Sequence, residues 1–253
     1  MTTESWAKTE RLRLTRAEVE ERLARGEHLE HVDLHDGDLA GLELRGKRFR
    51  HSIVYGLQLY RGDGDPATEV RTDIRNTDWT DAAMASIGQE AFFGRVNAEG
   101  AEFGFTETLV ERRQRHAASG QPPTDLDSGS YANFNGAEGN FLRTTWRNID
   151  FGGGSGYEVR FENADLIGAT FEGCDLSGID LSTSTATNLT VRNCTLNGLT
   201  IGAHQIDAFL DGIQLDGRPL RTHAAYRITT GHGRDILEEV GIRIAPSPPG
   251  RRT

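Results

Sequence analysis

Histidine and carboxylate side chains that could bind a metal or move protons gather near the start of the chain. Two of the histidines, His31 and His51, are 20 residues apart, and Asp33 and Asp36 lie beside the first. The others in this region are His28 and His35. Imidazole and carboxylate groups are common zinc ligands and general acids or bases. The alternative is that these positions face solvent and accept any polar residue. We expect no metal site, and His31 and His51 are the weak candidates for one.

Recognised catalytic and cofactor motifs are missing from the sequence. Residues 152–156 read GGGSG, which resembles a phosphate-binding loop, but no Lys-Ser or Lys-Thr pair and no helical pattern follow them. No spaced Cys/His cluster and no nucleophile elbow occurs. We therefore expect no cofactor, and a protein without catalytic activity is favoured over an enzyme.

The totals suggest a protein of the cytoplasm. The first ten residues lack the apolar stretch of a signal peptide. The mean hydropathy is −0.52, and no apolar run approaches the length of a membrane span. Only two cysteines occur, Cys174 and Cys194, which suits a reducing compartment. Aromatic residues make up 8% of the chain, which predicts a narrow core of small and medium side chains.

An apolar residue recurs at every fifth position over much of the chain. The clearest run lies between residues 157 and 206, where the centres are Phe161, Leu166, Phe171, Leu176, Leu181, Val191, Leu196, Ile201 and Ile206, with Ala186 as the weak unit. A helix repeats its apolar face every 3.6 residues and a strand every two, so a period of five fits neither. It requires a chain that turns a corner every five residues and stacks its coils into a solenoid.

The units resemble the pentapeptide-repeat family, whose pattern is A(D/N)LXX. The matching triplets are Ala164-Asp165-Leu166, Ala169-Thr170-Phe171, Cys174-Asp175-Leu176, Ile179-Asp180-Leu181, Ala132-Asn133-Phe134 and Ala101-Glu102-Phe103. The resemblance implies an all-β solenoid, a right-handed quadrilateral parallel β-helix with four pentapeptides per coil. Residues 20 apart should then lie on neighbouring rungs, which would bring His31 to His51 and Cys174 to Cys194.

The repeats predict three regions. Residues 1–26 form an arm and a capping helix, over about 16–25, that begins with the capping-box sequence TRAE. Residues 27–220 form the β-helix, interrupted at 61–70 and by a long inserted loop at 106–130. Residues 221–253 hold a second helix, which starts near Gly233, and a disordered tail. The basic stretch ERRQRH at 111–116 suggests a short helix inside the insertion.

Charge is concentrated in the repeats. The net charge is −10 for the whole chain, but residues 27–220 contain 30 acidic and 16 basic residues. Such a body repels nucleic acid and favours partners with a basic surface. The candidate acidic face consists of Glu158, Glu162, Asp165, Glu172, Asp175 and Asp180, and the candidate contacts on the insertion are Glu111, Arg112, Arg113 and Arg115.

Three functions remain open at this point. Some pentapeptide-repeat proteins mimic DNA, bind type II topoisomerases and protect DNA gyrase from inhibitors, so the resemblance implies a non-enzymatic DNA mimic of that kind. A general scaffold would instead dock another protein through the 106–130 insertion. An enzyme or small-molecule binder would use a pocket near the insertion or the N-terminal histidines. We expect no nucleic acid or membrane partner, and the C-terminal helix is a candidate for homodimer formation.

Overall fold

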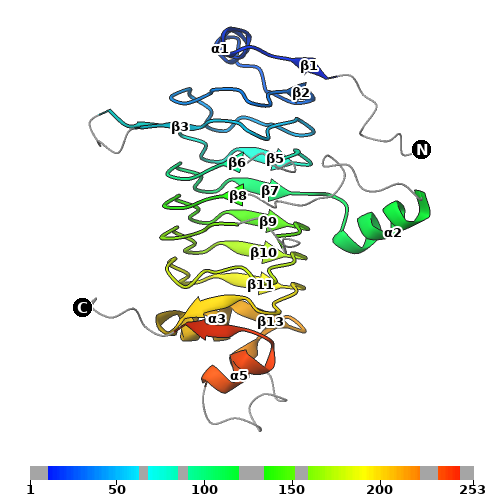
Figure 1. Cartoon of the computed structure of the whole chain (residues 1–253), viewed down its shortest axis with the longest axis vertical. Coiled ribbons are helices and arrows are strands. Elements are labelled where there is room, and N and C mark those ends of the chain that lie inside the picture. The colour runs from blue at the N-terminus through cyan, green and yellow to red at the C-terminus, as the bar shows by residue number, and fades with distance from the viewer. Residues whose placement is uncertain are drawn as a thin grey trace.

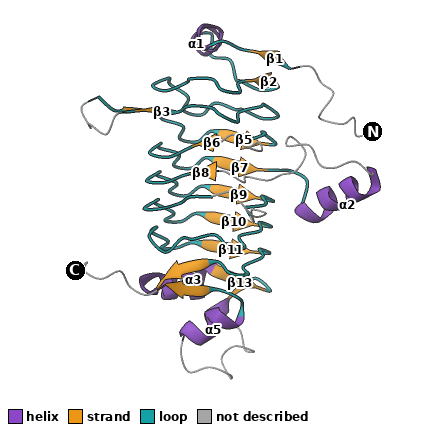
Figure 2. Cartoon of the chain, in the orientation of Figure 1, coloured by secondary structure: helices purple, strands orange, loops and turns teal. Residues whose placement is uncertain are grey.

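The molecule is a column of stacked coils. The structure is a computed structural model of the whole chain, in which residues 11–62, 68–84, 91–119, 134–151, 159–222 and 233–245 are described. Short strands lie one above another along the column (Figure 1). Helices lie at its two ends and, in one case, beside it (Figure 2). The stacked parallel strands make this a β-solenoid.

Each regular coil has four sides. The last regular coil is linked to the one before it by parallel pairs on every side, which are Thr170–Thr190, Asp175–Thr195, Asp180–Thr200 and Asp165–Thr185. We call the sides that contain these pairs sides 1, 2, 3 and 4, in that order. Each pair spans 20 residues, which is four units of five. Four short sides per coil are what the resemblance implied.

Side 1 carries the longest sheet. Its seven strands follow the order β14–β13–β11–β10–β9–β7–β5 and are parallel except for β13 and β14. They are β5 (Asp78–Thr80), β7 (Glu102–Gly104), β9 (Thr145–Arg147), β10 (Thr170–Glu172), β11 (Thr190–Arg192), β13 (Ile213–Leu215) and β14 (Arg218–Pro219). On side 3, β6 (Ala91–Phe92) pairs with β8 (Phe134–Asn135). β3 (Tyr60–Arg61) and β4 (Val70–Arg71) form an antiparallel hairpin that leaves the column at the predicted 61–70 interruption.

The interruptions lengthen individual coils without breaking the ladder. The number of residues per coil is the sequence separation between paired residues on neighbouring coils. From the first coil to the last, it is 20 (Asp33–Ile53), 30 (Arg48–Asp78), 24 (Asp78–Glu102), 43 (Glu102–Thr145), 25 (Thr145–Thr170) and 20 (Thr170–Thr190). The prediction that residues 20 apart stack is therefore correct for the first and last coils and wrong for those between. The strands on either side of each interruption still pair, so the ladder continues across it.

Two positions of each unit explain its sequence. The Asp or Asn before an apolar centre accepts a hydrogen bond from the backbone N–H two residues on, as Asp165 does from Ile167 at 3.1 Å and Asn140 from Leu142 at 3.1 Å. This is the local turn that short polar side chains favour. The residue two after the centre has a positive φ, for example 75° at Gly178, which suits Gly or Asn.

Aromatic rings fill the middle of the column, which corrects the prediction of a core built from small side chains. Trp79, Phe103 and Trp146 are fully buried on side 1. The Trp79 indole N–H donates to Thr77 Oγ1 at 2.6 Å, and that of Trp146 donates to Thr144 Oγ1 at 2.8 Å. The few aromatic residues are thus concentrated inside, where each buries a large apolar area.

The repeat frame between residues 134 and 151 differs from the prediction. Asn135 pairs with Arg160, and its side chain accepts from the N–H of Ala137, so Gly136 is the centre of this unit. Phe134 was predicted as the centre of the triplet Ala132-Asn133-Phe134. It instead occupies the inward position two residues before the centre Gly136, in the same repeat frame as Phe141. A Cβ on Gly136 would come within 2.8 Å of the Phe134 ring, so a glycine is needed there.

At the N-terminal end, β1 (Leu12–Arg13) pairs with β2 (Val32–Asp33), and α1 (Arg16–Ala24) lies over the first coil (Figure 1). Thr15 and Glu18 form the predicted capping box of α1, and Val19 is fully buried. Arg16 donates to the carbonyl oxygens of Asp38 and Ala40, which belong to the first coil. Helix and first coil are thus joined by core packing and by hydrogen bonds.

At the C-terminal end, the five-residue units give way to helices after β12 (Thr200–Gly202), although β13 still continues the side 1 sheet. Residue 206 begins a helix instead of forming a further centre. Besides β13 and β14, the elements described beyond β12 are η2 (Ala203–Gln205), α3 (Ile206–Gly212), η3 (Leu220–Thr222), α5 (Gly233–Glu239) and β15 (Arg243–Ala245), which pairs with β12. Gln205 is buried and donates to the carbonyl oxygens of Leu181 and Ser184 at 2.9 and 2.7 Å.

The predicted C-terminal helix exists, but its apolar side is used within the chain. Leu237 of α5 is fully buried and Ile236 is 9% exposed. α5 packs against α3 and is followed by β15, which extends side 3 by one rung. The apolar residues that suggested a dimer contact are therefore packed inside a single chain.

Candidate protein-interaction surface

The predicted acidic face is divided among the sides of the column. Glu172 lies on side 1, Asp175 on side 2, Asp180 on side 3 and Asp165 on side 4. Glu162 follows Phe161 on side 3, and Glu158 lies outside the described residues. These carboxylates surround the C-terminal half of the rod and do not share a single face.

Several of these carboxylates already have partners. Glu172 lies 2.9 Å from Arg192 and 3.7 Å from Arg147. Asp165 accepts from the Thr185 hydroxyl at 2.9 Å, in addition to its own turn. Asp180 accepts from the N–H of Ser182 at 2.8 Å. One oxygen of Asp165 and of Asp180 is thus engaged in forming the corner, while the negative charge stays at the surface.

Side 1 alternates acidic and basic residues along the rod. Arg48 pairs with Glu30 at 2.9 Å, Arg147 pairs with Glu102 at 3.1 Å, and Arg50 hydrogen-bonds Asp78. Burial raises the pKa of Asp78, but the hydrogen bonds from Arg50 and Thr80 outweigh it and leave this pKa below its usual value. Side 1 is therefore a row of ion pairs, and the charge excess of the body lies elsewhere.

The insertion begins with a helix that is fixed to the column. α2 (Leu109–Ser119) contains the predicted basic stretch and stands beside the stack (Figure 1). Arg112 is 3% exposed and donates to the carbonyl oxygens of Asn148 at 2.7 Å and Glu107 at 3.0 Å. Its guanidinium carbon lies 4.2 Å from the centre of the Phe105 ring, a favourable cation–π contact. Arg112 is thus an anchor within the chain.

The other three predicted insertion residues have separate roles. Arg113 lies 3.2 Å from Asp150 and 3.5 Å from Asp175 on side 2, so it contacts a member of the predicted acidic set. Arg115 pairs with Glu107 at 2.9 Å. Glu111 accepts from the N–H and hydroxyl of Thr108 at the start of the helix, and these bonds lower its pKa. Within the described part of the insertion, Arg113 is the residue seen to contact a member of the predicted acidic set, Asp175.

The candidate histidines are rung neighbours. The rings of His31 and His51 stack with centroids 4.8 Å apart, and His51 Nδ1 lies 3.9 Å from Asp81 Oδ2. Burial lowers the pKa of His51 below its ordinary value, although Asp81 opposes this shift. Among the residues that the structure describes, no group of three or more His, Cys, Asp or Glu side chains could hold a metal.

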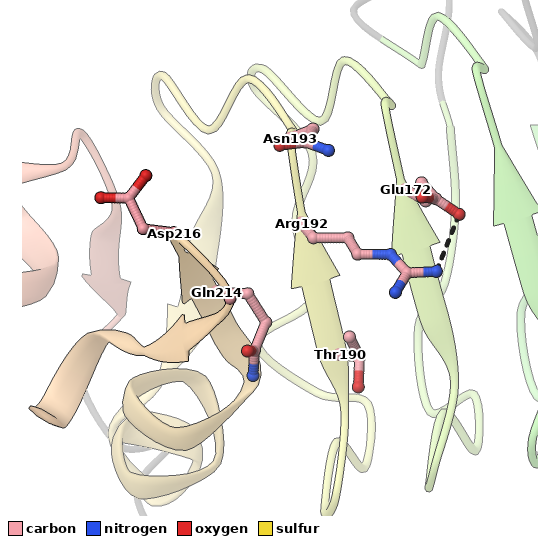
Figure 3. Close-up of a pocket in the computed structure, with 7 residues that line it drawn as sticks. Glu172, Thr190, Arg192, Asn193, Gln214 and Asp216 are labelled. Carbon is pink, nitrogen blue, oxygen red and sulfur yellow. Dashed lines mark hydrogen bonds and ion pairs between the residues drawn. The ribbon is translucent and has the colours of Figure 1, made fainter. Parts of the chain in front are cut away.

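Two hollows were missed by the sequence analysis. One lies on side 1 near the C-terminal end, where Figure 3 shows Glu172, Arg192 and Gln214 around a polar opening of about 660 Å³. The other lies beside the β3–β4 hairpin and is lined by Tyr60, Arg95 and neighbours on side 3. Each is formed by residues from coils of unequal length, so the spacing along the sequence gave no sign of it.

The coils define a class of protein, the pentapeptide solenoid, in which four five-residue sides make one turn. The family model for pentapeptide repeats matches residues 157–198 with eight copies. Residues 157–198 are thus pentapeptide repeats, and the interrupted N-terminal coils continue the same ladder beyond the matched segment. No helix in the described ranges is long and apolar enough to cross a membrane.

No curated protein matches the chain. Solved structures with a likeness include trypsin-treated QnrB1, a plasmid-mediated fluoroquinolone resistance protein, at 20% identity and a TM-score of 0.31 over 93% of this chain and 100% of that one. HetL, involved in heterocyst differentiation regulation in the cyanobacterium Nostoc sp. strain PCC 7120, is 13% identical with a TM-score of 0.22, over 81% of this chain and 69% of that one.

Proposed function

We propose that this protein is a non-enzymatic interaction module whose C-terminal coils bind a basic protein surface. The observation that carries the proposal is the charge of residues 157–216, which contain nine acidic residues and two arginines. The regular coils fix Glu172, Asp175, Asp180 and Asp165 on sides 1, 2, 3 and 4 of the rod. Fixed charges of one sign attract a complementary surface and raise the rate of association.

The more specific form of the proposal is a DNA mimic that binds a type II topoisomerase such as gyrase. A rod with acidic residues on more than one side resembles a duplex, which also carries its negative charge around its axis. The carboxylates of side 1 add little to this resemblance because arginines pair with them. The reason to consider this form is that some pentapeptide-repeat proteins mimic DNA and bind type II topoisomerases. Protection of the enzyme from inhibitors would then follow from competition with DNA for the same basic channel.

Gyrase supercoiling, measured with and without a quinolone, tests the specific form. The protein should change supercoiling or reduce drug-stabilised cleavage at micromolar concentration. A matched variant, Asp165→Asn with Asp175→Asn and Asp180→Asn, should lose the effect. Asn also forms the local turn, as Asn140 does here, so this variant removes charge and keeps the corners. No change with the wild-type protein would remove the topoisomerase form.

A second candidate function is a scaffold that docks its partner on the insertion. The helix α2 stands out from the column, and Val110 on it is 62% exposed. Because Arg112 fixes α2 in place, a partner that binds the exposed side of α2 would cause little further loss of conformational entropy in this chain. In a pull-down against a defined partner, Val110→Asp should abolish capture if this function holds, while the triple Asp→Asn variant should not.

A further inference from the structure

The two cysteines lie on neighbouring rungs of side 2. Asp175 pairs with Thr195, and the N–H of Thr195 donates to the carbonyl oxygen of Cys174 at 2.9 Å. Cys174 and Cys194 occupy the same inward position of their units, two residues before Leu176 and Leu196. Adjacent parallel strands lie about 4.8 Å apart, which falls within the Cα separations that disulfides span. Both thiols are free in this structure.

Their surroundings differ. Cys174 is 1% exposed, and its Sγ lies 3.4 Å from the carbonyl oxygen of Trp146. Cys194 lies one rung nearer the C-terminal end and is only partly buried. A hydrogen bond from Cys174 lowers the pKa of the Cys194 thiol, while burial raises the pKa of Cys174. Cys194 is thus the more accessible thiol and the more easily ionised one.

We infer that Cys194 is a site of oxidation by hydroperoxides and that Cys174 resolves it, so that a reversible disulfide joins the last two regular coils. A partly accessible thiol beside a second cysteine is the arrangement that favours this chemistry. The buried partner protects the oxidised sulfur from further oxidation because it reacts within the same chain.

The atoms balance in two steps. The Cys194 thiolate attacks one oxygen of the peroxide, the O–O bond breaks, and a sulfenic acid and hydroxide form. Cys174 gives its proton to the hydroxide and attacks Cys194 Sγ; the S–O bond breaks, and the departing hydroxide takes up a proton as water. Two thiols are oxidised to one disulfide, and one peroxide is reduced to water. A dithiol reductant reverses the change.

The test treats the purified full chain with one equivalent of hydrogen peroxide. Free thiols are then alkylated, and the intact mass is measured. We expect the loss of both alkylation sites, a mass lower by two hydrogens, a monomer on a non-reducing gel and recovery of both sites with dithiothreitol. The oxidised chain should also unfold at a higher temperature, because the cross-link restricts the unfolded state.

Alanine variants separate the roles of the two cysteines. Alanine is buried at the equivalent inward position in Ala164 and Ala169, so both variants should fold. Cys174→Ala should stop at a sulfenic acid on Cys194 that dimedone traps, and it should react more slowly than the wild type because it lacks the hydrogen bond that lowers the pKa of Cys194. Cys194→Ala should keep its buried thiol over the same period. The inference is overturned if the wild-type protein retains both thiols, if it forms only bonds between chains, or if Cys194→Ala reacts as fast as the wild type.

Discussion

Phe103 and Trp146 stack with ring centroids 4.2 Å apart although 43 residues separate them in the chain. Their strands, β7 and β9, are adjacent in the side 1 sheet, and the 106–130 insertion lies between them in the sequence. The backbone pairing between neighbouring coils is therefore preserved when residues are inserted at a corner. This relationship makes the insertion separable from the fold.

Excision of residues 107–129 should leave the solenoid intact. This removes 23 residues and reduces the 43-residue coil to the regular 20. The far-ultraviolet circular dichroism of β structure should persist, and the free energy of unfolding should fall by about 1–3 kcal/mol as buried hydrogen bonds of Arg112 are lost. Loss of the cooperative unfolding transition would contradict the separability of the insertion.

Arg112→Leu should release α2 from the column. The substitution removes a buried donor from the carbonyl oxygens of Asn148 and Glu107 and costs about 2 kcal/mol. Limited proteolysis should cut within 109–119 far faster than in the wild type. Gln114→Leu, on the exposed part of the same helix, is the control. Equal cleavage of the two variants would show that Arg112 does not anchor the helix.

The positive φ of Gly178 predicts that replacing this glycine lowers the stability of the protein. Its φ is 75°, and an added Cβ would meet nothing within 4 Å. Gly178→Ala should therefore lower the free energy of unfolding by about 1 kcal/mol through backbone strain alone. Gly178→Asn should cost less, because Asn tolerates this region. Urea denaturation measures both, and an alanine variant as stable as wild type would refute the strain.

The lowered pKa of His51 predicts that the folded protein loses stability in mild acid. Its pKa is lowered in the folded protein, chiefly by burial, whereas the unfolded chain has a pKa of about 6.5. Above pH 6.5 both states are neutral and the contribution is intact. As the pH falls below about 6.5, the unfolded state binds the proton first, so stability decreases until the folded pKa is passed.

The comparison variant for this titration is His51→Asn, since asparagine occupies other corners of positive φ such as Asn148. Urea denaturation between pH 7.5 and about 5 should show a smaller acid-dependent loss in this variant than in the wild type. His28→Asn controls for the removal of a histidine elsewhere. Identical pH profiles for wild type and His51→Asn would exclude His51 as the cause.

The period of five predicted the stacked coils and the contact between His31 and His51. The two terminal helices were predicted from a different local signal, the capping and stop residues at their ends. The coil lengths of 24 and 25 were not predictable, since the ladder accepts extra residues at any corner. The frame around Gly136 was missed because its centre has no apolar side chain. The acidic residues were expected on one face, although a coil of four units already assigns Asp165, Asp175 and Asp180 to different sides.

Competition between this protein and duplex DNA on a purified type II topoisomerase tests the central claim most directly. With labelled linear duplex bound to the enzyme, the wild-type protein should displace it in proportion to its concentration, and the Asp165→Asn, Asp175→Asn, Asp180→Asn variant should displace it at least tenfold less effectively, as expected for about 1.4 kcal/mol of lost binding energy. Binding of the protein without displacement of DNA, or equal displacement by the variant, would contradict the acidic rod as a mimic of DNA.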